Sequence, residues 1–198
     1  MNWMQKDVQT SAQMEIAWQC APVLTGVKPS NILTLKNVSE KEVAESLKEM
    51  GISYSMLCDS GVRKVWLIYR EEEILEILGK KEYSEFLDTL GYRGFEFPQM
   101  LQIMNLRFEG YQHGSAEFPH ELGIFLGYPL ADVKGFIEHN GKDFLYQGYW
   151  KVYENVEERK KMFSIYNVVK EEFIREMQAG KDPVSYTHLR AHETPEHL

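Results

Sequence analysis

Apolar residues recur along this chain at two spacings, one typical of helices and the other typical of strands. Val43 and Leu47 lie four positions apart on an apolar stripe, the spacing of one face of a helix. Ser39 precedes this stripe, and with Glu42 three positions later it forms a capping box. Gly51 follows the stripe as a helix-ending glycine. The pattern therefore predicts a short helix with both ends marked.

Strand-like patterns occur in four segments. The first is residues 31–36, NILTLK, which is β-branched and alternating. Residues 53–58 and 62–69 flank the turn sequence Asp-Ser-Gly, and they predict a β-hairpin whose second arm is apolar enough to be a central strand. Residues 144–153, FLYQGYWKVY, are expected to form a strand or one arm of a hairpin.

Helical patterns are expected in several further places. The first covers about residues 5–18, and the breaker APVLTGVKPS, with Pro22 near its start, is expected to end it. The others cover residues 71–78, 82–90, 98–108 and 156–177. Together with the strands they predict an α+β fold, a small mainly antiparallel sheet covered by several helices.

The segment FPHELGIFLGYPLADVKGFIE, residues 118–138, predicts a helix-turn-helix-like corner. Pro119 suits the first helical position, Gly127 suits the turn, and Pro129 suits the start of the second helix. DNA reading also needs polar side chains on the outer face of the second helix. We expect that face to carry Leu130, Ala131, Asp132, Lys134 and Gly135, of which only Lys134 suits DNA. A structural corner is therefore preferred to a DNA-binding one.

Length and charge narrow the class of protein. The 198 residues, 43% of them hydrophobic, predict a single globular α+β domain over residues 1–182. The formal net charge of −8 disfavours nucleic acid as a partner. A secretory signal pattern and a membrane-spanning apolar run are both missing, so a cytoplasmic location away from membranes is expected. Two distant cysteines predict neither a disulfide framework nor a cysteine-based zinc site.

The last residues, 183–198, are expected to be an artefactual or disordered tail. Residues 184–198, VSYTHLRAHETPEHL, look like a translated sequencing adapter. This segment holds three of the six histidines, His188, His192 and His197, so those histidines are left out of any metal-site argument.

Candidate chemistry in the first part of the chain rests on three residues. Cys20 is either a nucleophilic or redox thiol or a small buried apolar residue. Lys28, in a loop rich in proline and glycine, either meets an anionic ligand or is simply solvated. Arg70 directly follows the apolar strand and either meets a carboxylate or phosphate or caps the strand end.

Candidate chemistry in the second part rests on two residue pairs. His120 and Glu121 are either a general acid/base pair or surface and capping residues, since neighbours on a helix point about 100° apart. Trp150 and Lys151 lie in GYWKVY, which either stacks a planar ligand on an aromatic and cationic face or packs as ordinary sheet. No metal ligands, catalytic residues or cofactor can be assigned from these patterns.

Four segments of the chain carry a family resemblance: CAPVLTGVKPSNIL, VWLIYR, FPHELGIFLGYPLADVKGFIE and GYWKVY. They are similar to the uncharacterised bacterial domain-of-unknown-function family 3793, in family order from about Cys20 to the last expected helix. The FPHE, GxFLGYP and DVKGFI blocks are the most specific part. The family has no established activity. The occurrence of its members near flavodoxin and iron-handling genes implies a link to redox or metal physiology.

Three hypotheses about function follow. The first is a small ligand-binding or regulatory module with a small-molecule ligand or a protein partner. The second is an enzyme in which Cys20 or His120 works with Glu121, Lys28 and Arg70. The third, which the charge disfavours, is DNA binding through residues 118–138.

Overall fold

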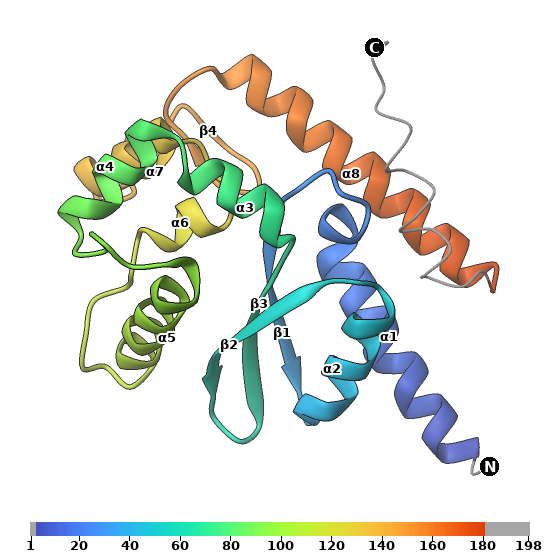
Figure 1. Ribbon diagram of the computed structural model, residues 1–198. Coiled ribbons are helices and arrows are strands. Elements are labelled where there is room, and N and C mark those ends of the chain that lie inside the picture. The colour runs from blue at the N-terminus through green and yellow to red at the C-terminus, as the bar shows by residue number, and fades with distance from the viewer. Residues whose placement is uncertain (1–2, 181–198) are drawn as a thin grey trace. The chain divides into compact units, whose positions relative to one another are not determined.

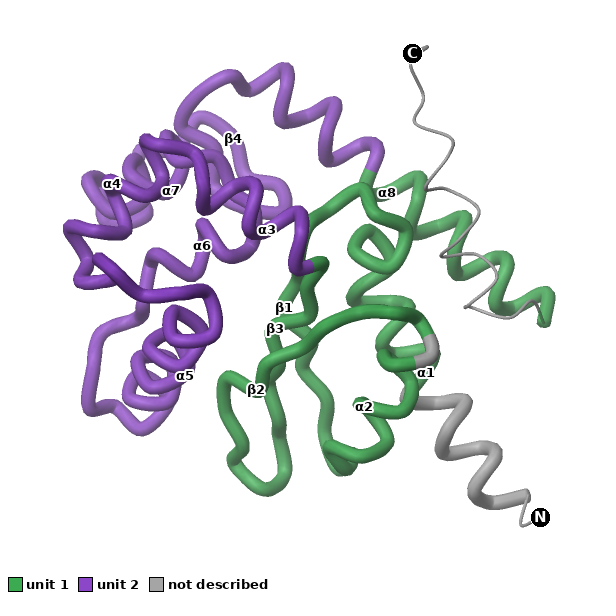
Figure 2. Tube along the Cα trace, in the orientation of Figure 1, with its two compact units in different colours: residues 1–70, 166–198 green, residues 71–165 purple. Residues whose placement is uncertain are grey.

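The structure is a computed structural model that describes residues 3–180, with side chains from residue 13 onwards except that of Glu49 (Figure 1). The chain divides into two compact units (Figure 2). Unit 1 comprises residues 1–70 and 166–198, and unit 2 comprises residues 71–165. The single domain expected over residues 1–182 stays a prediction. The expected tail over residues 183–198 lies outside the described residues.

Unit 1 is built on a three-stranded antiparallel sheet. Its elements are α1 (Trp3–Leu24), β1 (Ser30–Lys36), α2 (Glu40–Glu49), β2 (Ser53–Asp59), β3 (Arg63–Tyr69) and the later part of α8 (Val156–Gln178). The strand order is β1-β3-β2, so the apolar second arm of the predicted hairpin is the central strand. Leu33 of β1 lies opposite Trp66 of β3, and both are fully buried.

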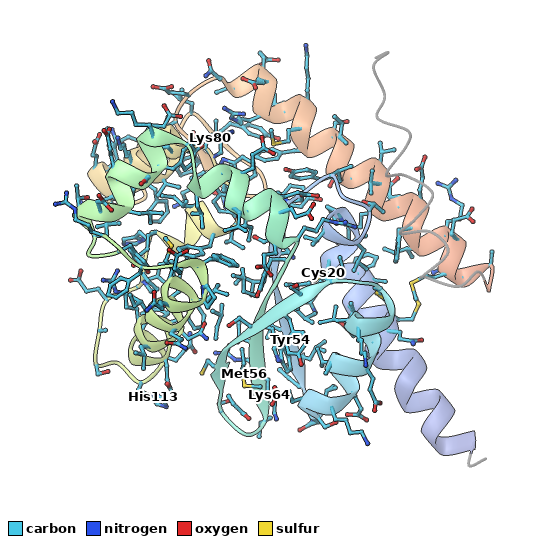
Figure 3. The ribbon with its side chains drawn as sticks, in the orientation of Figure 1. Cys20, Tyr54, Met56, Lys64, Lys80 and His113 are labelled. Atoms are coloured by element: carbon cyan, nitrogen blue, oxygen red, sulfur yellow. The ribbon has the colours of Figure 1, made fainter. Side chains whose placement is uncertain are left out.

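Helices α1 and α2 and two residues of α8, Phe173 and Met177, cover a face of this sheet. The core holds Cys20 from α1, Leu47 from α2, Trp66 from β3 and Phe173 from α8. Tyr54 and Met56, alternate residues of β2, pack against the same core (Figure 3). Alternation along β2 and the apolar stripes of the helices therefore converge on one core, as an amphipathic pattern requires.

The first helix is longer than its sequence pattern predicts. It continues into the expected breaker and ends at Leu24, with Pro22 inside its last turn. The residues of this extension are almost entirely buried, so apolar packing outweighs the missing N–H of the proline. The Pro22 carbonyl also accepts hydrogen bonds from the backbone N–H groups of Val27 and Lys28, at 2.9 Å each, which closes the turn that follows.

The signals for α2 are confirmed in full. The Ser39 side chain accepts a hydrogen bond from the Glu42 backbone N–H, and the Glu42 carboxylate accepts one from the Ser39 backbone N–H at 2.7 Å. Gly51 has a φ of 66°, the left-handed conformation that ends helices.

Unit 2 consists of short helices and one small hairpin. Its elements are α3 (Glu71–Leu78), α4 (Lys81–Thr89), α5 (Phe97–Gln112), α6 (Leu122–Phe125), α7 (Leu130–Glu138), β4 (Tyr146–Gln147), β5 (Lys151–Val152) and the first part of α8. The predicted helices and the GYWKVY hairpin are therefore present. The fold class is α+β, as predicted.

The corner at residues 118–138 differs from its prediction in three ways. Pro119 lies outside any helix, and α6 has only four residues. The expected outer face of α7 is also wrong, because Leu130, Asp132 and Gly135 are buried. The cause is the second hairpin: a Cβ on Gly135 would lie only 2.5 Å from Cγ of Tyr153, so the chain after β5 covers this side of the helix.

Among the residues that the structure describes, no helix combines the length and the apolar character needed to cross a bilayer.

Candidate functional site

A cavity of about 300 Å³ lies within unit 2, between the helical corner and the β4–β5 hairpin. Hairpin residues 147–151 contribute to one side, and Leu122, Gly123 and Val133 of the corner contribute to the other. We call this cavity the hairpin pocket. Its volume is at the lower end of the range for small-molecule sites, roughly 300–1,000 Å³.

The hairpin is short, and its turn reaches the pocket directly. Gln147 pairs with Lys151, and the Leu145 backbone N–H donates to the Val152 carbonyl at 2.9 Å. Inside the turn, the Gly148 N–H donates to the Trp150 carbonyl at 3.0 Å. Two paired positions give little ladder stability alone, so the hairpin needs support from side chains.

Asp132 of α7 supplies that support. Its carboxylate accepts hydrogen bonds from the Trp150 indole Nε1 at 2.7 Å and from the backbone N–H groups of Tyr153 at 2.7 Å and Glu154 at 3.3 Å. Arg159 Nε lies 3.7 Å from the same carboxylate. Only 2% of Asp132 is exposed, so a buried charge is paired and hydrogen-bonded, as burial requires. The carboxylate thereby ties the hairpin to the helix.

Trp150 forms an aromatic wall of the pocket. Its ring stacks on Tyr128, with centroids 4.5 Å apart and planes 25° apart, and meets Phe163 edge-on at 4.5 Å. Gly148 lies so close to Phe163 that a Cβ there would be 2.3 Å from Cδ2 of the ring. Burial raises the pKa of Tyr128 to about 12, so its hydroxyl stays protonated near neutral pH.

His120 stands at the pocket between two aromatic rings. Its ring centroid lies 5.4 Å from that of Phe118 and 5.2 Å from that of Phe136. The residue is half-buried. Its side chain forms no hydrogen bond with the described residues, so neither ring nitrogen is engaged by them. Both nitrogens are therefore available to a molecule in the pocket.

Lys151 brings a positive charge to the same cavity. Its Nζ donates to the Gly141 carbonyl at 2.6 Å and lies 5.6 Å from the ring centroid of Phe136 and 4.9 Å from that of Phe144. An ammonium group has three N–H donors, and this geometry uses one of them on a protein acceptor. The aromatic contacts hold the side chain in place without neutralising it.

Glu121 has a structural role that separates it from its neighbour His120. It is buried, and its Oε1 accepts hydrogen bonds from Arg107 and from the Tyr92 hydroxyl, the latter at 3.2 Å. Burial and the nearby carboxylate raise the pKa of Tyr92. Arg107 also donates to the Leu90 carbonyl at 2.7 Å. The interpretation of Glu121 as a surface residue is wrong, because this network draws it into the interior. Glu121 does hold the N-cap position of α6, but its side chain forms no capping hydrogen bond there.

Cys20 and Lys28 are neighbours in unit 1 and are both buried. Lys28 Nζ donates to Asn31 Oδ1 at 2.6 Å. Burial lowers the pKa of Lys28 to about 8 and raises the pKa of the Cys20 thiol to about 12, although the Lys28 charge partly opposes that rise. The thiol is therefore not a ready nucleophile. The expectation of a solvated Lys28 is wrong, since only 2% of it is exposed.

Arg70 holds the end of α1 in place. Its Nε and Nη2 atoms donate to the carbonyls of Val23 and Leu24, at 2.7 and 2.8 Å. The last carbonyls of a helix lack partners within the helix, so this arginine satisfies two of them. Arg70 thus connects the end of β3 to the end of α1.

Of the seven residues singled out in the sequence, three meet at one place: His120, Trp150 and Lys151 all line the hairpin pocket. Cys20, Lys28 and Arg70 belong to unit 1, and Glu121 belongs to a separate network in unit 2. Asp132, which holds the hairpin in place, is not among the residues that the sequence pattern singles out. Its one sequence signal was an acidic position between the apolar residues Leu130 and Val133.

No group of three or more His, Cys, Asp or Glu side chains is arranged to hold a metal ion within the part of the chain that the structure describes.

Comparison with known proteins gives one family. A family described as "Protein of unknown function (DUF3793)" matches residues 16–186. No curated protein and no solved structure matches the chain.

Proposed function

The chain belongs to the family of proteins of unknown function DUF3793, and we propose that it is a small-molecule-binding protein whose ligand occupies the hairpin pocket. The observation that carries the proposal is the meeting of His120, Trp150 and Lys151 around a cavity of about 300 Å³. Two segments distant in sequence, the helical corner and the GYWK turn, supply these residues.

The lining has the composition expected of a ligand site. Its walls are mostly apolar and aromatic, and a few polar groups converge on it. Tyr128 and Trp150 present stacked rings, which favour a flat ligand over a bulky aliphatic one. The half-buried His120 ring supplies two nitrogens that can fix the orientation of a polar group on that ligand.

Binding is preferred to catalysis because the proposed acid/base partners are engaged elsewhere. Glu121 accepts hydrogen bonds from Arg107 and Tyr92, and Arg70 donates to helix carbonyls. The Cys20 thiol has a raised pKa of about 12. An enzyme built from these groups would lack both an activated nucleophile and a nearby base.

The test is a direct binding measurement with two flat probes, 2-naphthamide and 2-naphthoate. Isothermal titration calorimetry on the full chain gives their affinities for wild type and for Gln147→Trp, which places a large ring at the pocket mouth. Gln147 is exposed, so the substitution spares the core. We expect wild type to bind at least one probe, and Gln147→Trp to bind it about tenfold more weakly or worse, a change of roughly 1.4 kcal/mol.

The matched control is Glu109→Trp, which adds the same ring at an exposed position of α5 away from the pocket. Its affinity should stay within about twofold of wild type. Failure of wild type to bind either probe, or equal weakening in both tryptophan variants, would overturn the proposal.

A further inference from the structure

We infer that the ligand of the hairpin pocket is a planar aromatic carboxylate, with its carboxylate at Lys151 and His120 and its ring near Trp150. The inference rests on the proposed function and specifies the chemical class of the ligand. It follows from the distribution of charge around the cavity.

Lys151 contributes a charge that the protein does not neutralise. Among the described residues, the partners of its ammonium are the Gly141 carbonyl and the rings of Phe136 and Phe144, none of which is an anion. Gln147, its cross-strand partner, is neutral. A carboxylate entering the pocket would give this ammonium the anionic acceptor that the Gly141 carbonyl is not, and hydrogen bonds that involve ionised groups are stronger than neutral ones.

The one carboxylate that lines the pocket does not compensate this charge. Asp132 is held by the Trp150 indole and two backbone N–H groups, and it forms an ion pair with Arg159. Its oxygens are already used as acceptors, and its charge is already matched. The electrostatic balance of the cavity is therefore positive, and complementarity favours a negative ligand.

A cluster of aromatic rings can also bind cations, so that alternative needs a specific argument. Cation–π attraction acts within roughly 6 Å of a ring centroid. The Lys151 ammonium already occupies this range over Phe136 and Phe144. A second cation in the same small cavity would be repelled by it at close range. Phe136 and Phe144 therefore contact the lysine, whereas Tyr128 and Trp150 can contact the flat part of the ligand.

His120 provides a second contact for the acid group. Its ring lies between Phe118 and Phe136, and Phe136 is also one of the rings beneath Lys151. The imidazole and the ammonium therefore both lie close to one aromatic ring. A carboxylate has two oxygens, so one can accept from Lys151 while the other accepts from an imidazole N–H.

The experiment compares 2-naphthoate with 2-naphthamide, which have nearly the same size and shape but differ in charge. We expect wild type to bind the carboxylate about tenfold more tightly or better. In Lys151→Met the methionine keeps an apolar side chain against Phe136 and Phe144. The affinity for 2-naphthoate should fall to about that for 2-naphthamide, and the affinity for 2-naphthamide should not change. Unchanged binding of 2-naphthamide shows that the variant is folded.

Lys142→Met is the matched control, because Lys142 is an exposed lysine of the same segment that does not line the pocket. It should keep the wild-type preference. Equal affinity of wild type for the two probes would overturn the inference while leaving the proposed function standing. The same holds if both methionine variants lose the preference equally. Failure of both probes to bind would instead overturn the proposed function.

Discussion

The indole Nε1 of Trp150 donates a 2.7 Å hydrogen bond to the carboxylate of Asp132, and both residues are buried. This contact links an aromatic wall of the hairpin pocket to helix α7. The other Asp132 oxygen accepts from the Tyr153 backbone, so one side chain fixes both the ring and the chain that follows it. The shape of the pocket thus depends on a carboxylate whose oxygens are both bound by donors of the protein itself.

Asp132→Asn should destabilise the protein by about 2–4 kcal/mol. An amide can accept on one oxygen only, so its NH₂ group would face either the Trp150 indole or the Tyr153 backbone N–H. The Arg159 guanidinium would also lose its buried ionic partner and keep, among the described residues, only the exposed Glu158. Urea denaturation followed by circular dichroism measures the free energy of unfolding.

The control for this change is Asp143→Asn, a mostly exposed carboxylate 3.6 Å from His139. It should change the free energy of unfolding by less than about 0.5 kcal/mol. If Asp132→Asn changes the free energy of unfolding as little as this control does, the hydrogen bonds of Asp132 do not determine stability.

Gly148→Ala should cost about 1–3 kcal/mol, because the added Cβ would lie 2.3 Å from the Phe163 ring. Replacing Phe163 by leucine makes room for that methyl group. The double variant should therefore be less destabilised than the sum of the two single variants, by about 1 kcal/mol. Simple additivity, measured by urea denaturation, would contradict the close contact.

Substitutions at the adjacent residues His120 and Glu121 should affect different properties, ligand binding for His120 and stability for Glu121. Glu121→Gln removes the charge that Arg107 and Tyr92 bind in the interior and should cost about 1–3 kcal/mol. His120→Gln should leave stability within about 1 kcal/mol, because the ring forms no hydrogen bond with the described residues. It should weaken 2-naphthoate binding about threefold or more.

Calorimetry and urea denaturation of the same two variants separate these effects. A His120→Gln protein with wild-type affinity and lowered stability would assign the histidine to packing alone.

Lys28 should make stability depend on pH in the mildly alkaline range. Burial lowers its pKa from 10.5 to about 8, so the folded state releases the proton first as pH rises. The unfolded state then binds more protons, and stability rises with pH through this window. Cys20 acts in the opposite direction from about pH 9 upwards, because its folded pKa of about 12 lies above its ordinary value of 9.0.

The measurement is the difference in unfolding free energy between wild type and Lys28→Met. This difference should shift by roughly 1 kcal/mol in favour of wild type between about pH 7.5 and about pH 9. The methionine variant lacks the titrating amine, and groups that do not interact with Lys28 cancel in the comparison. Cys20 does interact with Lys28, but its folded pKa of about 12 keeps the thiol protonated over this range. A difference that stays constant with pH would show that Lys28 titrates normally.

Local signals in the sequence predicted much of the secondary structure because they act over a few residues. The Ser39–Glu42 capping box and Gly51 mark the ends of α2, as predicted. The Asp-Ser-Gly turn between β2 and β3 likewise sets the hairpin. Such features need no knowledge of the rest of the chain.

Features that depend on distant packing could not be predicted in this way. Pro22 reads as a breaker, yet burial of the residues around it keeps α1 helical to Leu24. Asp132 reads as an outer residue of α7, since nothing local shows that the hairpin covers that side. His120 and Lys151 line one cavity although they lie about thirty residues apart in sequence, and only the tertiary fold brings them there.

One wall of the pocket is formed by five consecutive residues, 147–151, which make up the turn of the short β4–β5 hairpin and one paired position beside it. The turn and the helical corner that carries His120 are consequently encoded in different parts of the gene. Lengthening or shortening that turn would resize the cavity without altering a residue of the helical corner. An engineer who wished to give this protein a different ligand would therefore vary the turn and leave Asp132, its anchor, in place.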